Sequence, residues 1–262
     1  MSKWKNSTRK TFYAMKRYLS EFCYRLLLIN AYWLKRSRHF FVLDLNRKNQ
    51  LFTLVGVEPR RYFQMNRKKT RIRLESGDMS TWTNEATVKM ITDFLAKRFG
   101  NKALNGICHG VRTGYEVDWF LKGLPIDSTC LGTDIEPSAT AHPRVVTQDF
   151  HEPRADWLSS FDFVYTNSQD HALEPRLALS TWMNQLKPNG LLLLEHSRSH
   201  GKRHINDIDV LGIETEIVPY LLLDWFKGAI YVSHKIEINM ISDEHVVFVV
   251  EKSKPCDITL RL

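Results

Sequence analysis

The sequence predicts a doubly wound α/β domain whose sheet is mostly parallel and ends in a C-terminal antiparallel hairpin. Strand-like and helix-like segments alternate from residue 80 to residue 195, the pattern of a sheet that helices cover on both faces. The run Leu191–Glu195 is apolar almost throughout, as expected of a strand in the middle of such a sheet. Two later strand-like runs, 229–239 and 245–252, are joined by a short connection that suits an antiparallel pair.

Periodicity and turn residues locate the individual elements. The first helix of the domain is expected to begin near Asn84 and to end at Gly100, with Val88, Ile91 and Leu95 on its apolar face. Further helices are expected at residues 115–124, 173–186 and 208–226, with one helical turn at 157–160. The parallel strands are expected at residues 103–108, 128–133, 144–147, 161–166 and 191–195.

Charge divides the 262-residue chain into two parts. With 43% apolar and 25% charged residues, the composition is that of a globular protein and excludes a disordered, collagen-like or coiled-coil chain. Residues 1–75 hold 19 basic and 4 acidic side chains, whereas residues 76–262 hold 18 basic and 25 acidic ones. We therefore expect a basic N-terminal extension at 1–75 and the α/β domain at 76–262. In the extension we expect a helix at 8–36 and a hairpin built from His39–Leu45 and Gln50–Val57.

The basic extension has three interpretations: a solvated surface, a segment paired with its own acidic domain, or a docking surface for an anionic partner. Its first helix is rich in Phe, Tyr, Trp and Leu, and no signature of an RNA-binding module is present. We therefore favour an anionic membrane surface over nucleic acid as the partner of residues 1–75. The sequence does not predict an oligomeric state.

No membrane-spanning segment, secretory leader or metal site is expected. The longest uncharged apolar stretch near the N-terminus, Leu26–Leu34, has nine residues, and a membrane span needs about 20. The basic residues that precede and follow it make a poor signal peptide. Four cysteines show neither a Cys-x-x-Cys pair nor a zinc spacing. We expect a cytoplasmic protein, with peripheral membrane association as a second location.

Polar residues follow every expected parallel strand, although the strands themselves are apolar. Ligands of open parallel sheets bind at this edge, outside the carboxyl ends of the strands. A glycine-bearing turn follows the first strand, and the acids that follow the next two strands suit the hydroxyls of a ribose (Asp134) and the edge of an adenine (Asp149). The candidate cofactor-binding residues are His109, Gly110, Arg112, Gly114, Asp134, Asp149, Asn167 and Ser168.

From about Thr81 to Lys252 the chain resembles the class I S-adenosylmethionine-dependent methyltransferase fold. The resemblance rests on the glycine turn and on the segments Leu131–Asp134, Thr147–Asp149, Phe161–Ser168 and Leu186–Glu195. Within this fold the chain is most similar to small bacterial methyltransferase-like proteins with a Cys-His-Gly turn. The resemblance implies a Rossmann-like fold, S-adenosylmethionine as cofactor, and methyl transfer to an acceptor.

The first motif departs from the pattern of this family, which reads acid-x-Gly-x-Gly-x-Gly. Gly110 and Gly114 match the first and third glycines, whereas Arg112 replaces the second and Cys108 replaces the leading acid. The family's acid usually orders the methionine end of the cofactor. The Arg112 guanidinium could pair with the methionine carboxylate instead, or it could fill the space that the cofactor needs.

Methyl transfer from a sulfonium is an in-line displacement that the protein catalyses by alignment and, for a hydroxyl acceptor, by removing a proton. We expect His171 as the general base, with His196 and Asp170 as further candidates; Asp170 could equally cap the helix at 173–186. The expected function is methyl transfer to a small molecule, a sugar or a glycolipid. The alternatives are a non-catalytic binding module that keeps the fold, and an RNA methyltransferase that uses the basic extension.

Overall fold

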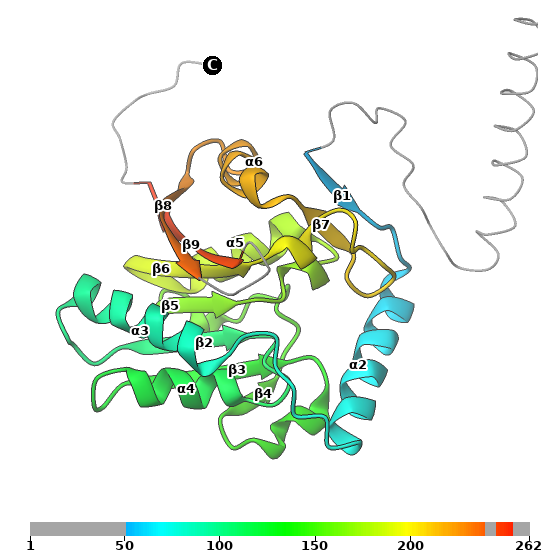
Figure 1. The fold of residues 1–262 in the computed structure, drawn as a ribbon, viewed down its shortest axis with the longest axis horizontal. Helices are drawn as coiled ribbons and strands as arrows, with labels where there is room; N and C mark the ends of the chain where they lie inside the picture. Colours follow the sequence, from blue (N-terminus) through cyan, green and yellow to red (C-terminus); the bar gives the residue numbers. More distant parts are fainter. Residues whose placement is uncertain (1–50, 239–244, 254–262) are drawn as a thin grey trace, which may run out of the picture.

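The structure of the protein is a computed structural model that describes residues 51–238 and 245–253. Within these residues a seven-stranded sheet forms the centre, with the strand order β4-β3-β2-β5-β6-β9-β8 (Figure 1). Neighbouring strands from β4 to β6 pair in parallel, and β9 runs antiparallel to both β6 and β8. The strands are β2 (Asn105–His109), β3 (Thr129–Asp134), β4 (Val145–Thr147), β5 (Phe161–Thr166), β6 (Leu186–His196), β8 (Ile230–Ile238) and β9 (His245–Lys252). This arrangement confirms the fold class expected from the sequence.

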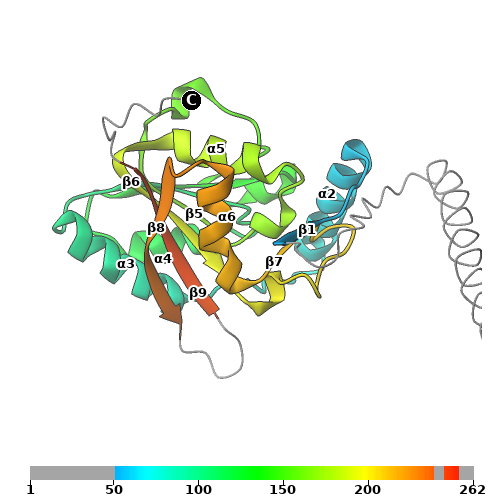
Figure 2. The ribbon, with the colours of Figure 1, turned by 90° about the horizontal axis from the view of Figure 1, so that it is seen from above.

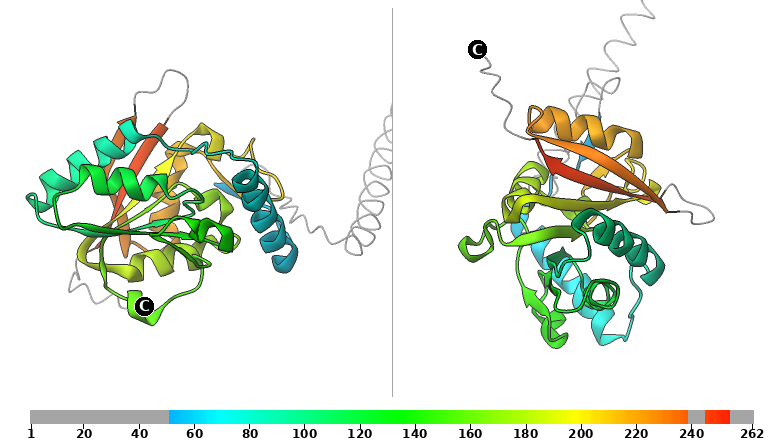
Figure 3. Two further views of the ribbon diagram at one scale, coloured as in Figure 1. Left: turned by 90° about the horizontal axis from the view of Figure 1, so that it is seen from below. Right: turned by 90° about the vertical axis from the view of Figure 1, so that its left-hand side faces the viewer.

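Helices cover both faces of the sheet and create two apolar cores (Figure 3). On one face lie α3 (Glu85–Phe99) and α4 (Tyr115–Gly123), and on the other lie α5 (Pro175–Gln185) and α6 (Val218–Trp225). The start of α3 is fixed by Asn84, whose Oδ1 accepts a hydrogen bond from the backbone N–H of Thr87 at 2.9 Å. None of the helices in the described part of the chain is long and apolar enough to cross a membrane.

The described part of the basic extension contacts the α/β domain through β1 (Phe52–Leu54) and α2 (Pro59–Glu75). Glu58 caps α2 by accepting hydrogen bonds from two backbone N–H groups of its first turn. The helix stands beside the edge at which the parallel strands end (Figures 1 and 2). β1 pairs antiparallel with β7 (Leu211–Ile213), so its described partner is not the hairpin strand expected at His39–Leu45. That run and the helix expected at 8–36 lie outside the described residues.

The prediction of a single helix at 208–226 is wrong. Leu211–Ile213 forms β7, and only Val218–Trp225 is α-helical. The reason is Pro219, which lacks an N–H and fits only the first turn of a helix, so the helix cannot extend back across it. Short 3-10 helices connect other elements: η1 (Pro137–Ala141), η2 (Ala155–Trp157), η3 (Gln169–His171), η4 (Arg198–His200) and η5 (Thr215–Ile217).

Candidate functional site

Two adjoining cavities lie at the carboxyl ends of the parallel strands. The smaller one, here called the Asp149 cavity, has a volume of about 140 Å³, and the larger one, the Glu116 cavity, has about 590 Å³. Both are lined by the turn after β2, by the segment after β5 and by one side of α2. The residues common to both are Lys69, Arg73, Gly110, Arg112, Ser168 and His171. The two cavities therefore form one site with two halves.

The turn after β2 brings backbone close to the segment after β5. Gly110 has φ +77°, and a Cβ atom there would lie 2.4 Å from Ser168 Oγ, so only glycine fits. Arg112 also has a positive φ, of 38°, and its backbone N–H donates to Asp134 Oδ2 at 3.0 Å. Gly114 does not line either cavity; with φ +80° it starts α4, and a Cβ there would meet the His142 ring at 2.5 Å.

Asp134 ends β3 and lines the Asp149 cavity. Its two oxygens accept from the backbone N–H groups of Arg112 (3.0 Å) and Glu136 (2.8 Å). Burial raises the pKa of Asp134, and these two hydrogen bonds partly oppose the rise. Because a carboxylate has about four acceptor positions, Asp134 retains acceptor capacity toward the cavity.

Asp149 follows β4 and lines the same cavity. Burial disfavours its charge, but Oδ1 accepts from His151 at both the backbone N–H (2.9 Å) and Nδ1 (2.7 Å), and the net effect is a lowered pKa. The aromatic ring of Phe150 and the side chain of Phe63 also line this cavity, so it combines two carboxylates with flat apolar surfaces. That combination suits a nucleoside.

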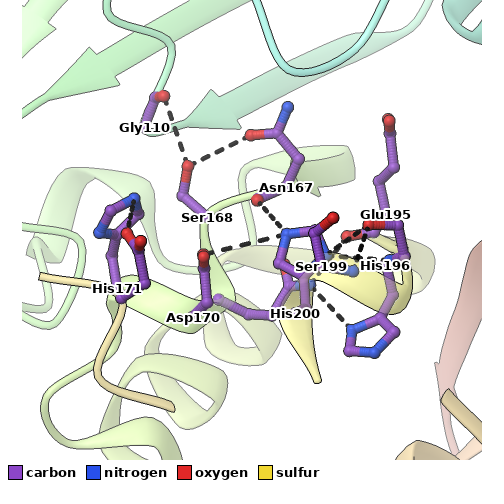
Figure 4. Close-up of polar contacts among 12 residues, drawn as sticks. Gly110, Asn167, Ser168, Asp170, His171, Glu195, His196, Ser199 and His200 are labelled. Atoms are coloured by element: carbon purple, nitrogen blue, oxygen red, sulfur yellow. Dashed lines mark hydrogen bonds and ion pairs between the residues drawn. The ribbon is translucent and has the colours of Figure 1, made fainter. Parts of the chain in front are cut away.

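Asn167 and Ser168 follow β5 at the centre of the site (Figure 4). Ser168 Oγ donates to Asn167 Oδ1 at 3.2 Å and lies 3.5 Å from the Gly110 carbonyl oxygen. The Asn167 carbonyl oxygen accepts from His200 Nε2 at 3.1 Å, while Asn167 Nδ2 is buried without a partner. Both residues line the Glu116 cavity, and Ser168 also lines the Asp149 cavity.

His171 borders both cavities, with a side chain that is 29% exposed. Its Nδ1 lies 3.1 Å from the carbonyl oxygen of Ile208, which can only accept, so Nδ1 is the donor in this contact; in a neutral ring the lone pair is then on Nε2. Nε2 lies 3.6 Å from Asp209 Oδ1, a carboxylate that would stabilise the protonated ring. Of the three candidate bases, His171 lines both cavities, Asp170 lines the Glu116 cavity, and His196 lines neither.

Asp170 lies in η3 beside the candidate base and does not cap a helix, because Glu174 precedes α5. Its Oδ1 is 4.0 Å from His200 Nε2 (Figure 4). Asp170, His171 and Asp209 each offer a ligand atom within 4.8 Å of the others, a proximity that the sequence did not predict. The Lys69 ammonium lies 3.7 Å from Asp209 Oδ1 and supplies a positive charge there.

Two expected site residues, His109 and His196, lie in the core instead. His109 is 1% exposed, stacks on Trp182, and bonds Thr133 Oγ1 and Gln185 Oε1, each at 2.8 Å. Burial lowers the pKa of His109 to about 4. His196 is also 1% exposed and bonded at both ring nitrogens, and burial lowers its pKa to about 3. Neither side chain borders the two cavities, because the last residue of a strand can face the helix layer.

Several cavity residues have no counterpart among the expected ones. Glu116, in the first turn of α4, is 4% exposed, and burial raises its pKa to about 8. Trp82 lines the Glu116 cavity, is 53% exposed, and contacts the His200 ring edge-to-face. Six further ones come from α2: Tyr62, Phe63, Asn66, Lys69, Thr70 and Arg73. The only sequence signal for α2 was its dense run of basic residues.

The comparisons with known proteins show the fold alone. No protein-family model and no curated protein matches the chain. Among solved structures, the chain is similar to Burkholderia thailandensis 1,6-didemethyltoxoflavin-N1-methyltransferase with bound 1,6-didemethyltoxoflavin and S-adenosylhomocysteine (TM-score 0.58, 15% identity, covering 79% of this chain and 98% of that one).

Two further structures give the same result. One is magnesium protoporphyrin IX methyltransferase from Synechocystis PCC 6803 with bound S-adenosylhomocysteine (TM-score 0.52, 11% identity, 75% of this chain and 100% of that one). The other is the CurJ carbon methyltransferase (TM-score 0.53, 14% identity, 71% and 58%). The chain thus has the fold of the class I S-adenosylmethionine-dependent methyltransferases.

Proposed function

We propose that this protein is an S-adenosylmethionine-dependent methyltransferase that acts on a polar small molecule. The observation that carries the proposal is one site with two halves: carboxylates suited to a nucleoside line one half, and a histidine whose Nδ1 is held by a backbone carbonyl oxygen borders both. The fold supports it, since solved structures with this fold include methyltransferases that bind S-adenosylhomocysteine. We also propose that the chain is related to small bacterial methyltransferase-like proteins with a Cys-His-Gly turn.

The residues of the Asp149 cavity fit the nucleoside part of the cofactor. Asp134 would accept hydrogen bonds from the ribose hydroxyls, and Asp149 would meet the adenine edge. Gly110 lets the backbone approach the ligand, because no Cβ fits beside Ser168. When bound, the sulfonium of the cofactor supplies the methyl group and the driving force.

His171 would remove the proton of a hydroxyl acceptor. Its Nδ1–H is held by the Ile208 carbonyl oxygen, which directs the lone pair of Nε2 away from that bond. As Nε2 takes the proton, the Asp209 carboxylate 3.6 Å away stabilises the imidazolium. The catalytic contribution of the chain is therefore alignment in the two halves and a positioned base.

The Glu116 cavity favours a polar acceptor of small-molecule size. Its lining includes hydroxyl groups, three histidines and charged groups of both signs, and its volume is about 590 Å³. An exposed aromatic residue of the lining, Trp82, suits a flat ring or a sugar face. Sugars and the headgroups of glycolipids fall in this class, and we keep both as acceptors to be tested.

The experiment that tests the proposal is calorimetric titration with S-adenosylmethionine and with S-adenosylhomocysteine. We expect both ligands to bind with 1:1 stoichiometry. A methyl-transfer assay against hydroxylated small molecules, sugars and glycolipids would follow. If neither ligand binds to the folded protein, the proposal that the protein is an S-adenosylmethionine-dependent enzyme is refuted.

Arg112 keeps the binding-module alternative open. It stands where the family has a glycine, has a positive φ, and lines both halves of the site. If Arg112 binds the cofactor, Arg112→Ala lowers the affinity for S-adenosylhomocysteine and Arg112→Lys restores only part of it. If Arg112 instead obstructs the site, wild type does not bind and Arg112→Gly does. The two interpretations predict changes of opposite sign.

A further inference from the structure

One wall of the Glu116 cavity carries buried polar atoms that have no hydrogen-bond partner. They belong to five residues that line the cavity: Arg112 (Nε), Thr113 (Oγ1), Glu116 (Oε2), Asn167 (Nδ2) and Asp170 (Oδ1, 4.0 Å from His200 Nε2). Three of these residues are more than nine-tenths buried, with exposures of 6% for Thr113, 4% for Glu116 and 7% for Asn167. Buried polar groups are nearly always paired in folded proteins, because an unpaired one has lost its hydrogen bonds to water without a replacement. Five of them around one cavity indicate a ligand that pairs them.

The chemistry of three of these groups, those of Arg112, Asn167 and Glu116, defines that ligand. Arg112 Nε and Asn167 Nδ2 can only donate, so they require an acceptor and favour an anionic one. An ionised Glu116 can only accept, so it requires a donor and favours a cation. A small ligand part that carries a carboxylate and an ammonium side by side satisfies both. That is the zwitterionic head of an α-amino acid.

Cys108 occupies the position at which the family has an acid, and it does not supply a negative charge. Its thiol is fully buried, and its Sγ lies 3.6 Å from Cys130 Sγ. Burial holds the pKa of Cys108 well above its usual value, so the thiol stays neutral. A cation bound near the turn after β2 must therefore find its carboxylate elsewhere, and Glu116 is eight residues further along the chain.

We propose that Glu116 binds the α-ammonium group of the methionine part of the cofactor, while Arg112 and Asn167 bind its carboxylate. This inference rests on the proposed function, since it assumes that the cofactor is bound. It makes Glu116, from the first turn of α4, the substitute for the acid that Cys108 replaces. It also gives Arg112 a binding role rather than an obstructing one.

A consequence of the burial of Glu116 is that binding must be coupled to loss of a proton. Charged or titratable groups face Glu116 from the turn (Arg112), from β2 (Cys108), from β3 (Asp134), from β5 (Tyr165) and from β6 (Glu195). With a pKa of about 8, set mainly by burial, Glu116 is protonated in the free protein at neutral pH. An ammonium ligand favours the ionised form. Binding should then release close to one proton at pH 6.5, and the affinity should rise with pH between 6 and 7.5.

The test is a cycle that changes one protein group and one ligand group. The ligands are S-adenosylhomocysteine and its analogue without the α-amino group, and the variant is Glu116→Gln, which keeps the shape and removes the charge. We expect the variant to weaken S-adenosylhomocysteine binding tenfold or more and to leave the affinity for the deamino analogue within twofold. Calorimetry in buffers of different ionisation enthalpy should show proton release for wild type and none for Glu116→Gln.

The matched control is Asp118→Asn, on the same helix two residues later. Asp118 is half-exposed, pairs with His142 and Arg144, and lines neither cavity, so its loss should not change either affinity. Equal weakening of both ligands by Glu116→Gln would mean a structural effect and would overturn the inference, as would unchanged S-adenosylhomocysteine binding. If the wild-type protein binds neither ligand, the proposed function itself fails. If the wild-type protein binds S-adenosylhomocysteine and Glu116→Gln binds it equally well, only the role of Glu116 fails.

Discussion

The hydroxyl of Tyr62 in α2 donates a hydrogen bond to the backbone carbonyl oxygen of His171, 109 residues later in the chain. Tyr62 is 2% exposed and belongs to an apolar cluster with Val55, Val57 and Val210. The bond therefore joins the basic extension to the segment that carries the candidate base. Because α2 forms one side of both cavities, the bond also holds this wall in position.

Tyr62→Phe should destabilise the protein without changing its fold. The substitution keeps the ring and removes the hydroxyl, so the His171 carbonyl loses its buried partner at a cost of about 1–3 kcal/mol. Urea unfolding measures the loss, and S-adenosylhomocysteine titration should show a lower affinity because the α2 wall is less firmly held. Tyr220→Phe is the matched control, since Tyr220 is 68% exposed and should change the free energy of unfolding by less than about 0.5 kcal/mol.

Asp134→Asn should weaken S-adenosylhomocysteine binding by about 1.5–3 kcal/mol, the range for hydrogen bonds to a charged group. Asparagine is preferred to alanine here, because the two oxygens of Asp134 accept from the backbone N–H groups of Arg112 and Glu136, and asparagine keeps one oxygen for one of these donors. Calorimetry with an analogue that lacks both ribose hydroxyls is the control. The variant and wild type should bind that analogue equally, and an equal loss with both ligands would contradict the ribose assignment.

Acid should destabilise the fold through its two core histidines. Burial holds the pKa of His109 at about 4 and that of His196 at about 3, whereas an unfolded histidine has about 6.5. Between these values the unfolded chain binds more protons than the folded one, so stability falls as the pH falls below 6.5. The loss for His109 amounts to about 3 kcal/mol by pH 4.

Urea unfolding of wild type and His109→Gln at pH 7 and pH 5 measures this difference. We expect a smaller loss between the two pH values in the variant, because one titrating group is gone. His234→Gln, at an exposed position on β8, should keep the slope of wild type. Glu116, whose pKa is raised, gives a slope of opposite sign above pH 4.5, and this contribution is common to all three proteins.

The order of strands and helices could be predicted from the sequence because each element has a local signal. The apolar run Leu191–Leu194 is fully buried in β6, and Asn84 and Gly100 bound α3 as expected. The wrong element, the helix expected at 208–226, contains Leu211–Ile213, whose strand depends on pairing with Phe52–Leu54. Such pairing between distant segments leaves no periodicity in the sequence.

The site could be predicted where residues follow a strand, and not where a distant element packs onto it. Asp134, Asp149, Ser168 and His171 all border the cavities because parallel strands end at one edge. His109 was misplaced because residues within a strand alternate between the two faces, and its side chain points to the layer of Trp182. The α2 residues were missed, since nothing local indicates that a basic helix will pack over the site.

Four basic side chains of α2 are already engaged by the α/β domain. Lys69 pairs with Asp209, Arg71 with Glu136 and Arg73 with Asp78, and Arg67 donates to the Ile135 carbonyl oxygen. For these residues the charge of the extension serves contacts within the chain. Residues 1–50, which lie outside the described part, hold a further 12 basic and 2 acidic side chains.

Two truncations should separate these roles of the extension. Deletion of residues 1–50 should abolish sedimentation with phosphatidylserine vesicles and leave S-adenosylhomocysteine affinity unchanged, because each basic residue near an anionic surface contributes about 1 kcal/mol. Deletion of residues 1–75 should also abolish S-adenosylhomocysteine binding, since it removes the α2 wall with Tyr62, Lys69 and Arg73.

Vesicle binding by the full chain should fall steeply as salt rises, because charges are screened over about 10 Å at 0.1 M, and neutral phosphatidylcholine vesicles should not bind. Equal sedimentation of the full and 1–50-deleted chains would exclude the membrane partner, and a salt-dependent shift with RNA alone would favour RNA instead.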